Sequence, residues 1–213
     1  MRFPALFTGI FATFACAWIG QALIPNAQLG KLQPQTEEDG SDIYPVNNSG
    51  IAARGRAVYI SEGCYYCHTQ QVRDEQAGSD IARGWGKRRT VARDYIYDDP
   101  VVLGHMRNGP DLANEGTRQI DGKPLDEAWH YLHLYNPRST VEGSVMPSFS
   151  YLFTKRKIAG ERSADALNLE GDDAVADGYE VVPNTEAKAL VAYLMSLDRS
   201  HALKEVKMEA QAK

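Results

Sequence analysis

Residues 63–70 of the chain read GCYYCHTQ. Two cysteines lie three positions apart and His68 directly follows the second, which is the C-x-x-C-H signature of covalent c-type haem attachment. The thiols of Cys64 and Cys67 are suited to add across the two vinyl groups of a haem and to form thioether bonds. His68 is then placed to donate an imidazole nitrogen to the iron. The stretch therefore predicts one covalently bound haem c.

Two other kinds of site use paired cysteines. A thioredoxin-like redox disulfide also has the C-x-x-C spacing, but it has no need of His68 and belongs to a βαβ pattern. A structural zinc site needs two further Cys or His ligands at similar spacing. The remaining cysteine, Cys16, lies far upstream in an apolar run. Both alternatives explain less of the stretch than haem attachment does.

The composition is that of a globular protein. Of the 213 residues, 43% are hydrophobic and 24% are charged, and the net charge is −5. These proportions argue against a disordered chain, and the length predicts one ordinary domain with additional segments. The densest basic stretch, residues 83–93, is too sparse to predict nucleic-acid binding. Three cysteines, two of them in the haem motif, provide no disulfide framework.

An uncharged run near the N-terminus predicts a membrane helix. Residues 3–24 read FPALFTGIFATFACAWIGQALI, and these 22 residues compare with roughly 20 needed to cross a bilayer. A cleaved signal peptide is the alternative, because residues 15–17, ACA, resemble a small-x-small cleavage site. Against cleavage, the apolar run continues well past Ala17. We expect residues 1–24 to be a retained anchor, with Arg2 favouring an internal N-terminus and an exported domain.

Changes in composition divide the remaining chain. Residues 25–49 contain three prolines and no periodic apolar face, which predicts a linker. We assign residues 50–203 to the haem domain and residues 204–213 to a polar tail. Within the domain, residues 160–182 are acidic and read either as a solvated insertion or as a docking patch for a basic electron-transfer partner.

Two helices are expected to frame the domain. Residues 50–62 precede the haem motif, and residues 185–197 carry apolar side chains at i, i+3, i+4 and i+7. Thr185, after Pro183, is the expected N-cap of the second helix. Gly55 would allow the two helices to cross closely.

The second axial ligand must come from the remaining methionines and histidines. Met146 lies in residues 143–149, GSVMPSF, an irregular loop in which a proline stiffens the backbone next to the sulfur. We therefore predict His68 and Met146 as the iron ligands, a pair that raises the reduction potential relative to two histidines. The rivals are Met106, Met195, Met208, His105, His130 and His133.

Other polar residues suit supporting roles. His130 and His133 stand at i, i+3 on one helix face, a spacing that could bind zinc, but no carboxylate or thiol cluster accompanies them and hydrogen bonding is the favoured interpretation. Arg73, Trp85 and Arg138 are candidates for binding the haem propionates, because a guanidinium matches the geometry of a carboxylate.

Taken together, these motifs resemble the mono-haem subunit II of cbb3-type cytochrome c oxidases. The stretches that carry the resemblance are 55–56 (GR), 59–70 (YISEGCYYCHTQ), 109–113 (GPDLA), 129–138 (WHYLHLYNPR) and 145–149 (VMPSF). The sequence departs from the family pattern in two places. Residues 20–25, GQALIP, lack the glutamate usual near the outer end of the anchor, and Asp74 stands where a proline is expected.

The resemblance implies an all-α, class I cytochrome c-like domain on a single N-terminal transmembrane helix. It implies that the Pro110 carbonyl accepts the second N–H of His68. It also implies a subunit of the bacterial inner membrane, with its haem on the periplasmic side, that relays electrons and performs no oxygen chemistry itself. The partners would be a catalytic haem–copper subunit and a further cytochrome c subunit or donor cytochrome. The alternatives are a stand-alone membrane-anchored cytochrome c shuttle and a haem sensor with an open sixth position.

Overall fold

The computed structural model describes residues 3–36, 40 and 42–208. Contacts divide the chain into two compact units: the described parts of Met1–Val46 with Val91–Tyr97, and the described parts of Asn47–Thr90 with Asp98–Lys213. Arg2, residues 37–39 and 41 of the predicted linker, and residues 209–213 of the predicted tail lie outside the described residues.

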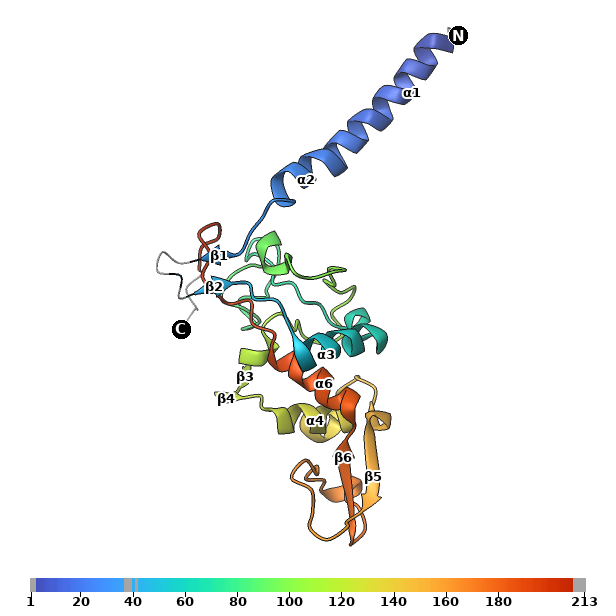
Figure 1. Cartoon of the computed structure of the whole chain (residues 1–213), viewed down its shortest axis with the longest axis vertical. Coiled ribbons are helices and arrows are strands. Elements are labelled where there is room, and N and C mark those ends of the chain that lie inside the picture. The colour runs from blue at the N-terminus through green and yellow to red at the C-terminus, as the bar shows by residue number, and fades with distance from the viewer. Residues whose placement is uncertain (1–2, 37–39, 41, 209–213) are drawn as a thin grey trace. The chain divides into compact units, whose positions relative to one another are not determined.

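The first unit contains the apolar helix (Figure 1). It comprises α1 (Phe3–Trp18), a π-helical turn over Ile19–Leu23 and α2 (Ile24–Leu29), and none of its residues is buried. Together they form the one helix among the described residues that is long and apolar enough to span a membrane. The helix continues past residue 24 because Pro25 falls in the first turn of α2, where a missing N–H is tolerated.

A small sheet completes the first unit. Strands β1 (Gln35–Thr36) and β2 (Ile43–Tyr44) pair antiparallel. The Tyr44 hydroxyl donates a 2.8 Å hydrogen bond to the carboxylate of Asp94, which lies in the 3₁₀ turn Ala92–Tyr95. This bond ties two segments that are distant in sequence.

In the second unit, helices α3 (Gly50–Ser61) and α6 (Thr185–Met195) pack against each other. The two helices approach closely at Gly55, where a Cβ would lie only 1.8 Å from the Ala189 carbonyl oxygen. Both helices were expected from the sequence. The N-cap prediction was wrong, because Asn184, one residue before Thr185, accepts from the Glu186 and Ala187 N–H groups.

The rest of the helical structure in the second unit is short. Helix α4 (Glu127–Tyr135) begins at an Asp126 cap, and α5 (Pro137–Thr140) follows directly. Turns of 3₁₀ helix are Cys64–Tyr66, Glu115–Thr117, Ser150–Leu152 and Gly171–Asp173.

The expectation of an all-α fold is not confirmed. Besides the β1–β2 pair, β3 (Gln119–Ile120) pairs with β4 (Lys123–Pro124), and β5 (Phe153–Lys157) pairs with β6 (Tyr179–Pro183). The β5–β6 pair is a protruding ribbon (Figure 1). The sequence YEVVP of β6 carries two adjacent valines, a residue type that favours strands. Two members of the predicted acidic insertion, Leu167 and Val181, are buried in the core, so this segment contributes to the fold.

The main core of the second unit joins α3, α6 and the segments around them. Its buried members are Tyr59, Leu112, Leu134, Phe149, Leu152, Phe153, Leu167, Val181, Ala187, Leu190, Val191, Tyr193, Leu194 and Leu197. The half-buried Cys64 and Met146 pack against this same cluster. The ring centroids of Tyr59 and Tyr193 lie 5.4 Å apart. The Tyr193 hydroxyl lies 3.1 Å from both the Nε2 and the Oε1 atom of Gln70.

We expect Gly55→Ala to lower the free energy of unfolding by about 2 kcal/mol, because overpacking the helix crossing outweighs the ~1 kcal/mol that alanine gains in helix propensity. Urea unfolding of the detergent-solubilised protein, followed by circular dichroism, measures the change. Ala57→Ser adds one atom on the exposed face of the same helix and should change stability by less than about 0.5 kcal/mol. Equal losses in both variants would contradict the close crossing.

Candidate functional site

The C-x-x-C-H stretch forms a tight turn directly after α3. Gly63 adopts φ +71°, a left-handed conformation that lets the chain leave the helix, and the 3₁₀ turn Cys64–Tyr66 follows. The N–H groups of Cys67 and His68 both donate to the Cys64 carbonyl, at 3.2 and 3.0 Å. Both thiols are free and half-buried. The turn therefore presents two thiols and one imidazole from a single compact element.

The His68 ring is held by the Gly-Pro turn. Its Nδ1 lies 2.8 Å from the Pro110 carbonyl oxygen, and the Gly109 N–H donates to the Cys67 carbonyl at 3.1 Å. A Cβ on Gly109 would lie 2.2 Å from His68 Cε1, so glycine is required for the turn to approach the ring. Burial lowers the pKa of His68 and favours neutral imidazole, the form that binds metals. With Nδ1–H donating to Pro110, Nε2 is the nitrogen left for iron.

Burial also raises the pKa of the Cys64 thiol to about 12, and the nearby charge of Glu62 adds to the effect. Cys64 therefore keeps its S–H proton at neutral pH.

Met146 is the methionine whose surroundings suit an axial ligand. It is half-buried against the same apolar cluster as Cys64. By contrast, Met106 and Met208 are 50% and 42% exposed, and Met195 belongs to helix α6. The backbone N–H of Met146 donates to the Ser144 hydroxyl at 3.3 Å, and this bond folds the loop locally.

The residues present fit a haem in their donor chemistry and in their surroundings. Two thiols, an imidazole oriented through Nδ1 and a thioether are the donors that a c-type haem uses. Two large apolar side chains next to these donors in sequence are open to solvent: Tyr66 is 52% exposed and Val145 is 77% exposed. Exposed apolar side chains beside such donors are expected where a ligand covers them.

The three candidates for the haem propionates are placed differently. The backbone N–H of Arg73 donates to the Asp80 carboxylate at 2.7 Å. The backbone N–H of Trp85 donates to the Asp80 backbone carbonyl at 3.0 Å, so both residues lie beside this aspartate. Arg138 is exposed in α5. Trp85 is half-buried, with the guanidinium groups of Arg83 and Arg107 at 5.0 and 5.4 Å from the ring centroid.

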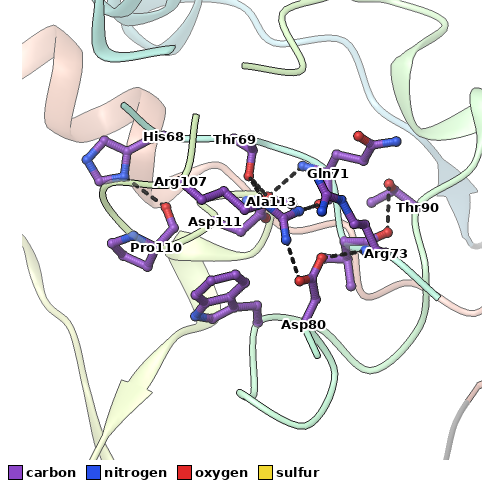
Figure 2. A network of polar contacts seen from close by, with 12 residues as sticks. His68, Thr69, Gln71, Arg73, Asp80, Thr90, Arg107, Pro110, Asp111 and Ala113 are labelled. Atoms are coloured by element: carbon purple, nitrogen blue, oxygen red, sulfur yellow. Dashed lines mark hydrogen bonds and ion pairs between the residues drawn. The ribbon is translucent and has the colours of Figure 1, made fainter. Parts of the chain in front are cut away.

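Sequence reasoning missed Arg107, the centre of a polar network (Figure 2). Its guanidinium pairs with the Asp80 carboxylate and donates to the Thr69 hydroxyl at 3.0 Å and to the Gln71 carbonyl at 2.6 Å. Asp111 joins this network from the other side of Thr69. The one available signal was position, since Arg107 and Asp111 flank the Asn-Gly-Pro turn and Thr69 follows His68.

His130 and His133 have structural partners. His130 Nδ1 lies 2.7 Å from the Asp126 carbonyl and its Nε2 lies 3.3 Å from the Glu115 carboxylate. Burial alone would raise the pKa of Glu115, but the contacts with His130 and Arg118 outweigh it and lower that pKa. His133 Nδ1 lies 2.6 Å from the Thr140 hydroxyl. Within the described part of the chain, no group of three His, Cys, Asp or Glu residues could hold a metal ion.

Comparison with known proteins identifies the family. The family described as cytochrome c oxidase, mono-heme subunit/FixO matches residues 33–169, more than half of the chain, including the C-x-x-C-H turn, the Gly-Pro turn and Met146. The chain belongs to this family. The mono-heme/FixO subunit is the mono-haem cytochrome c subunit of cbb3-type oxidases and transfers electrons. A comparison with curated proteins found no match.

Membership establishes several of the expectations from the sequence. The subunit has one haem, works with the catalytic part of a cytochrome c oxidase, and is a membrane subunit with one N-terminal candidate transmembrane helix.

Acid stability should depend on His133. Burial, with smaller effects from His130, His68 and Arg118, lowers the pKa of His133 from 6.5 to about 4. Between these values the unfolded chain binds more protons than the folded one, so stability falls as pH drops through the window. We expect the fall in unfolding free energy between pH 7 and pH 4 to be about 2 kcal/mol smaller in His133→Gln than in the wild type. This figure allows for solvent screening of a half-buried ring.

Unfolding free energies measured from pH 7 to pH 4 test this expectation. His105→Gln, at an exposed histidine, is the matched control and should leave the slope as in the wild type. A slope that His133→Gln does not reduce would contradict it.

Proposed function

We propose that the haem of this subunit is bound covalently through Cys64 and Cys67. Each thiol adds across one vinyl group: the sulfur bonds to the carbon next to the porphyrin ring, and the thiol hydrogen goes to the terminal carbon. No oxidant or reductant is consumed. The proposal is supported by the two free thiols at the 3₁₀ turn Cys64–Tyr66, one at its first residue and one on the residue that follows it.

We propose His68 and Met146 as the axial ligands of this haem. The bound iron supplies one reversible electron transfer. Pro110 would orient His68 through its carbonyl, and Met146 would supply the second ligand, a pairing with histidine that raises the reduction potential and would leave no site for oxygen. Arg73, Trp85 and Arg138 are proposed partners of the propionates. The contact that carries this proposal is the 2.8 Å approach of His68 Nδ1 to the Pro110 carbonyl.

The domain is proposed to be a class I cytochrome c with an added ribbon. Three features support this: the close crossing of α3 and α6, the haem motif directly after α3, and a methionine in an irregular loop later in the chain. Residues 50–203 would form this domain and residues 204–213 a tail, while residues 1–24 and 25–49 would serve as anchor and linker.

In the cell, the anchor is proposed to lie in the bacterial inner membrane with the haem domain in the periplasm. The subunit would then receive electrons from a donor cytochrome or a further cytochrome c subunit. It would pass them to the haem–copper subunit, where oxygen is reduced.

The assembly is tested by purifying the complex from native membranes in mild detergent, through a C-terminal tag, and recording a reduced-minus-oxidised spectrum. We expect c-type and b-type haem bands together with oxygen consumption. A c-type band from an isolated 23.6 kDa chain would instead indicate a free-standing shuttle.

The ligand assignment is tested with Met146→Ala. This variant should keep its covalent haem but lose the near-infrared sulfur-to-iron band of the oxidised protein, and its reduced form should bind carbon monoxide at neutral pH. Met106→Ala, at a half-exposed methionine, is the control and should retain the band. A band that survives in Met146→Ala would remove this residue from the iron.

A further inference from the structure

Two short segments of the second unit run side by side at His68. Residues 67–71 contain the imidazole, and residues 107–113 contain the carbonyl that accepts from it. Backbone bonds join the segments on both sides of that contact: Gly109 N–H to the Cys67 carbonyl at 3.1 Å, and Leu112 N–H to the Thr69 carbonyl at 2.8 Å. The geometry of the His68–Pro110 bond therefore depends on how firmly these segments are held together.

One buried carboxylate holds both segments. Asp111, directly after Pro110, accepts from the Thr69 hydroxyl at 2.6 Å and from the Gln71 N–H at 2.7 Å, and its other oxygen accepts from the Ala113 N–H at 2.9 Å. Burial raises the pKa of Asp111, against the opposing effect of these bonds. Asp111 is only 2% exposed, and burying a carboxylate costs free energy unless its oxygens accept hydrogen bonds. The three donors must therefore stay in place around it.

Arg107 closes the other side of the contact. It donates to the Thr69 hydroxyl and the Gln71 carbonyl and pairs with Asp80 (Figure 2). It also lies 3.8 Å from the Asp111 carboxylate and over the face of Trp85. The Thr69 hydroxyl thus donates to Asp111 while accepting from Arg107, and it links the two charged groups next to the haem-binding histidine.

We propose that Thr69, Arg107 and Asp111 are positioning residues that hold the Pro110 carbonyl against His68 Nδ1 and thereby lower the reduction potential of the haem. This inference rests on His68 being the proximal ligand, as proposed above. A short bond from Nδ1–H to a carbonyl increases the electron donation of the imidazole to iron and favours the oxidised state. A slackened bond raises the potential. None of the three side chains needs to touch the iron.

Thr69→Val is the decisive variant, because it removes the hydroxyl without changing charge or side-chain size. We expect its midpoint potential, measured by spectroelectrochemistry on the purified complex, to rise above that of the wild type. Thr69→Ser restores the hydroxyl and should return the potential to the wild-type value.

The matched control is Thr90→Val. Thr90 is another buried threonine of the same unit, and its hydroxyl donates to the Val72 carbonyl at 3.3 Å and makes no contact with Thr69, Arg107 or Asp111 in Figure 2. It should leave the potential unchanged. If Thr69→Val does not shift the potential, or if Thr90→Val shifts it equally, the inference is overturned.

A second variant covers the case in which Thr69→Val fails to fold. Arg107→Lys keeps the positive charge but loses the planar fork that reaches three acceptors, so its potential should also rise. An unshifted potential in that variant would equally overturn the inference.

The failure of this inference is distinguishable from failure of the proposed haem site. Haem staining after denaturing electrophoresis reports covalent attachment, and the near-infrared band reports axial ligation. A variant that keeps both but has an unshifted potential counts against the positioning role alone. A wild-type protein without covalent haem would count against the site itself.

Discussion

The site depends on the contact between the His68 imidazole and the Pro110 carbonyl. The imidazole can reach this oxygen only because Gly109 has no side chain, since a Cβ there would overlap the ring. The same turn returns a hydrogen bond to Cys67, so the motif and the Gly-Pro turn form one unit although some forty residues separate them. A ligand held through its second nitrogen has a fixed tautomer and a fixed orientation. The orientation of the His68 imidazole therefore begins with a backbone constraint.

The second requirement of the site is that the side chains proposed to bind the haem pack against one apolar core. Cys64 and Met146 pack against one cluster that also contains Tyr59 and Tyr193 from the crossing helices. The position of the haem motif therefore follows from the α3–α6 contact, because the motif leaves α3 one turn after Tyr59. A change at the helix crossing would be transmitted to the thiols without altering any donor.

Spacing and periodicity in the sequence predicted the apolar N-terminal helix and the helices before and after the motif. The mono-haem family was predicted from the resemblance of its motifs to those of known proteins. The sequence could not predict contacts between polar residues distant in the chain, and so Arg107, Asp111 and Thr69 were missed. The ribbon was missed for a different reason. Charges in residues 160–182 suggested a solvated insertion, whereas Leu167 and Val181 are sparse apolar residues with no helical period. The N-cap was misplaced because Asn184 and Thr185 are both competent caps, and local chain geometry chose between them.

The charged network beside His68 is better understood as a source of geometry than of stability. Buried ion pairs often contribute little net stability, because desolvating the charges offsets their attraction. The planar guanidinium of Arg107 and the carboxylate of Asp111 nevertheless fix directions that apolar packing leaves free. An electron carrier gains from such rigidity, because small changes in the bond to its proximal histidine alter its driving force.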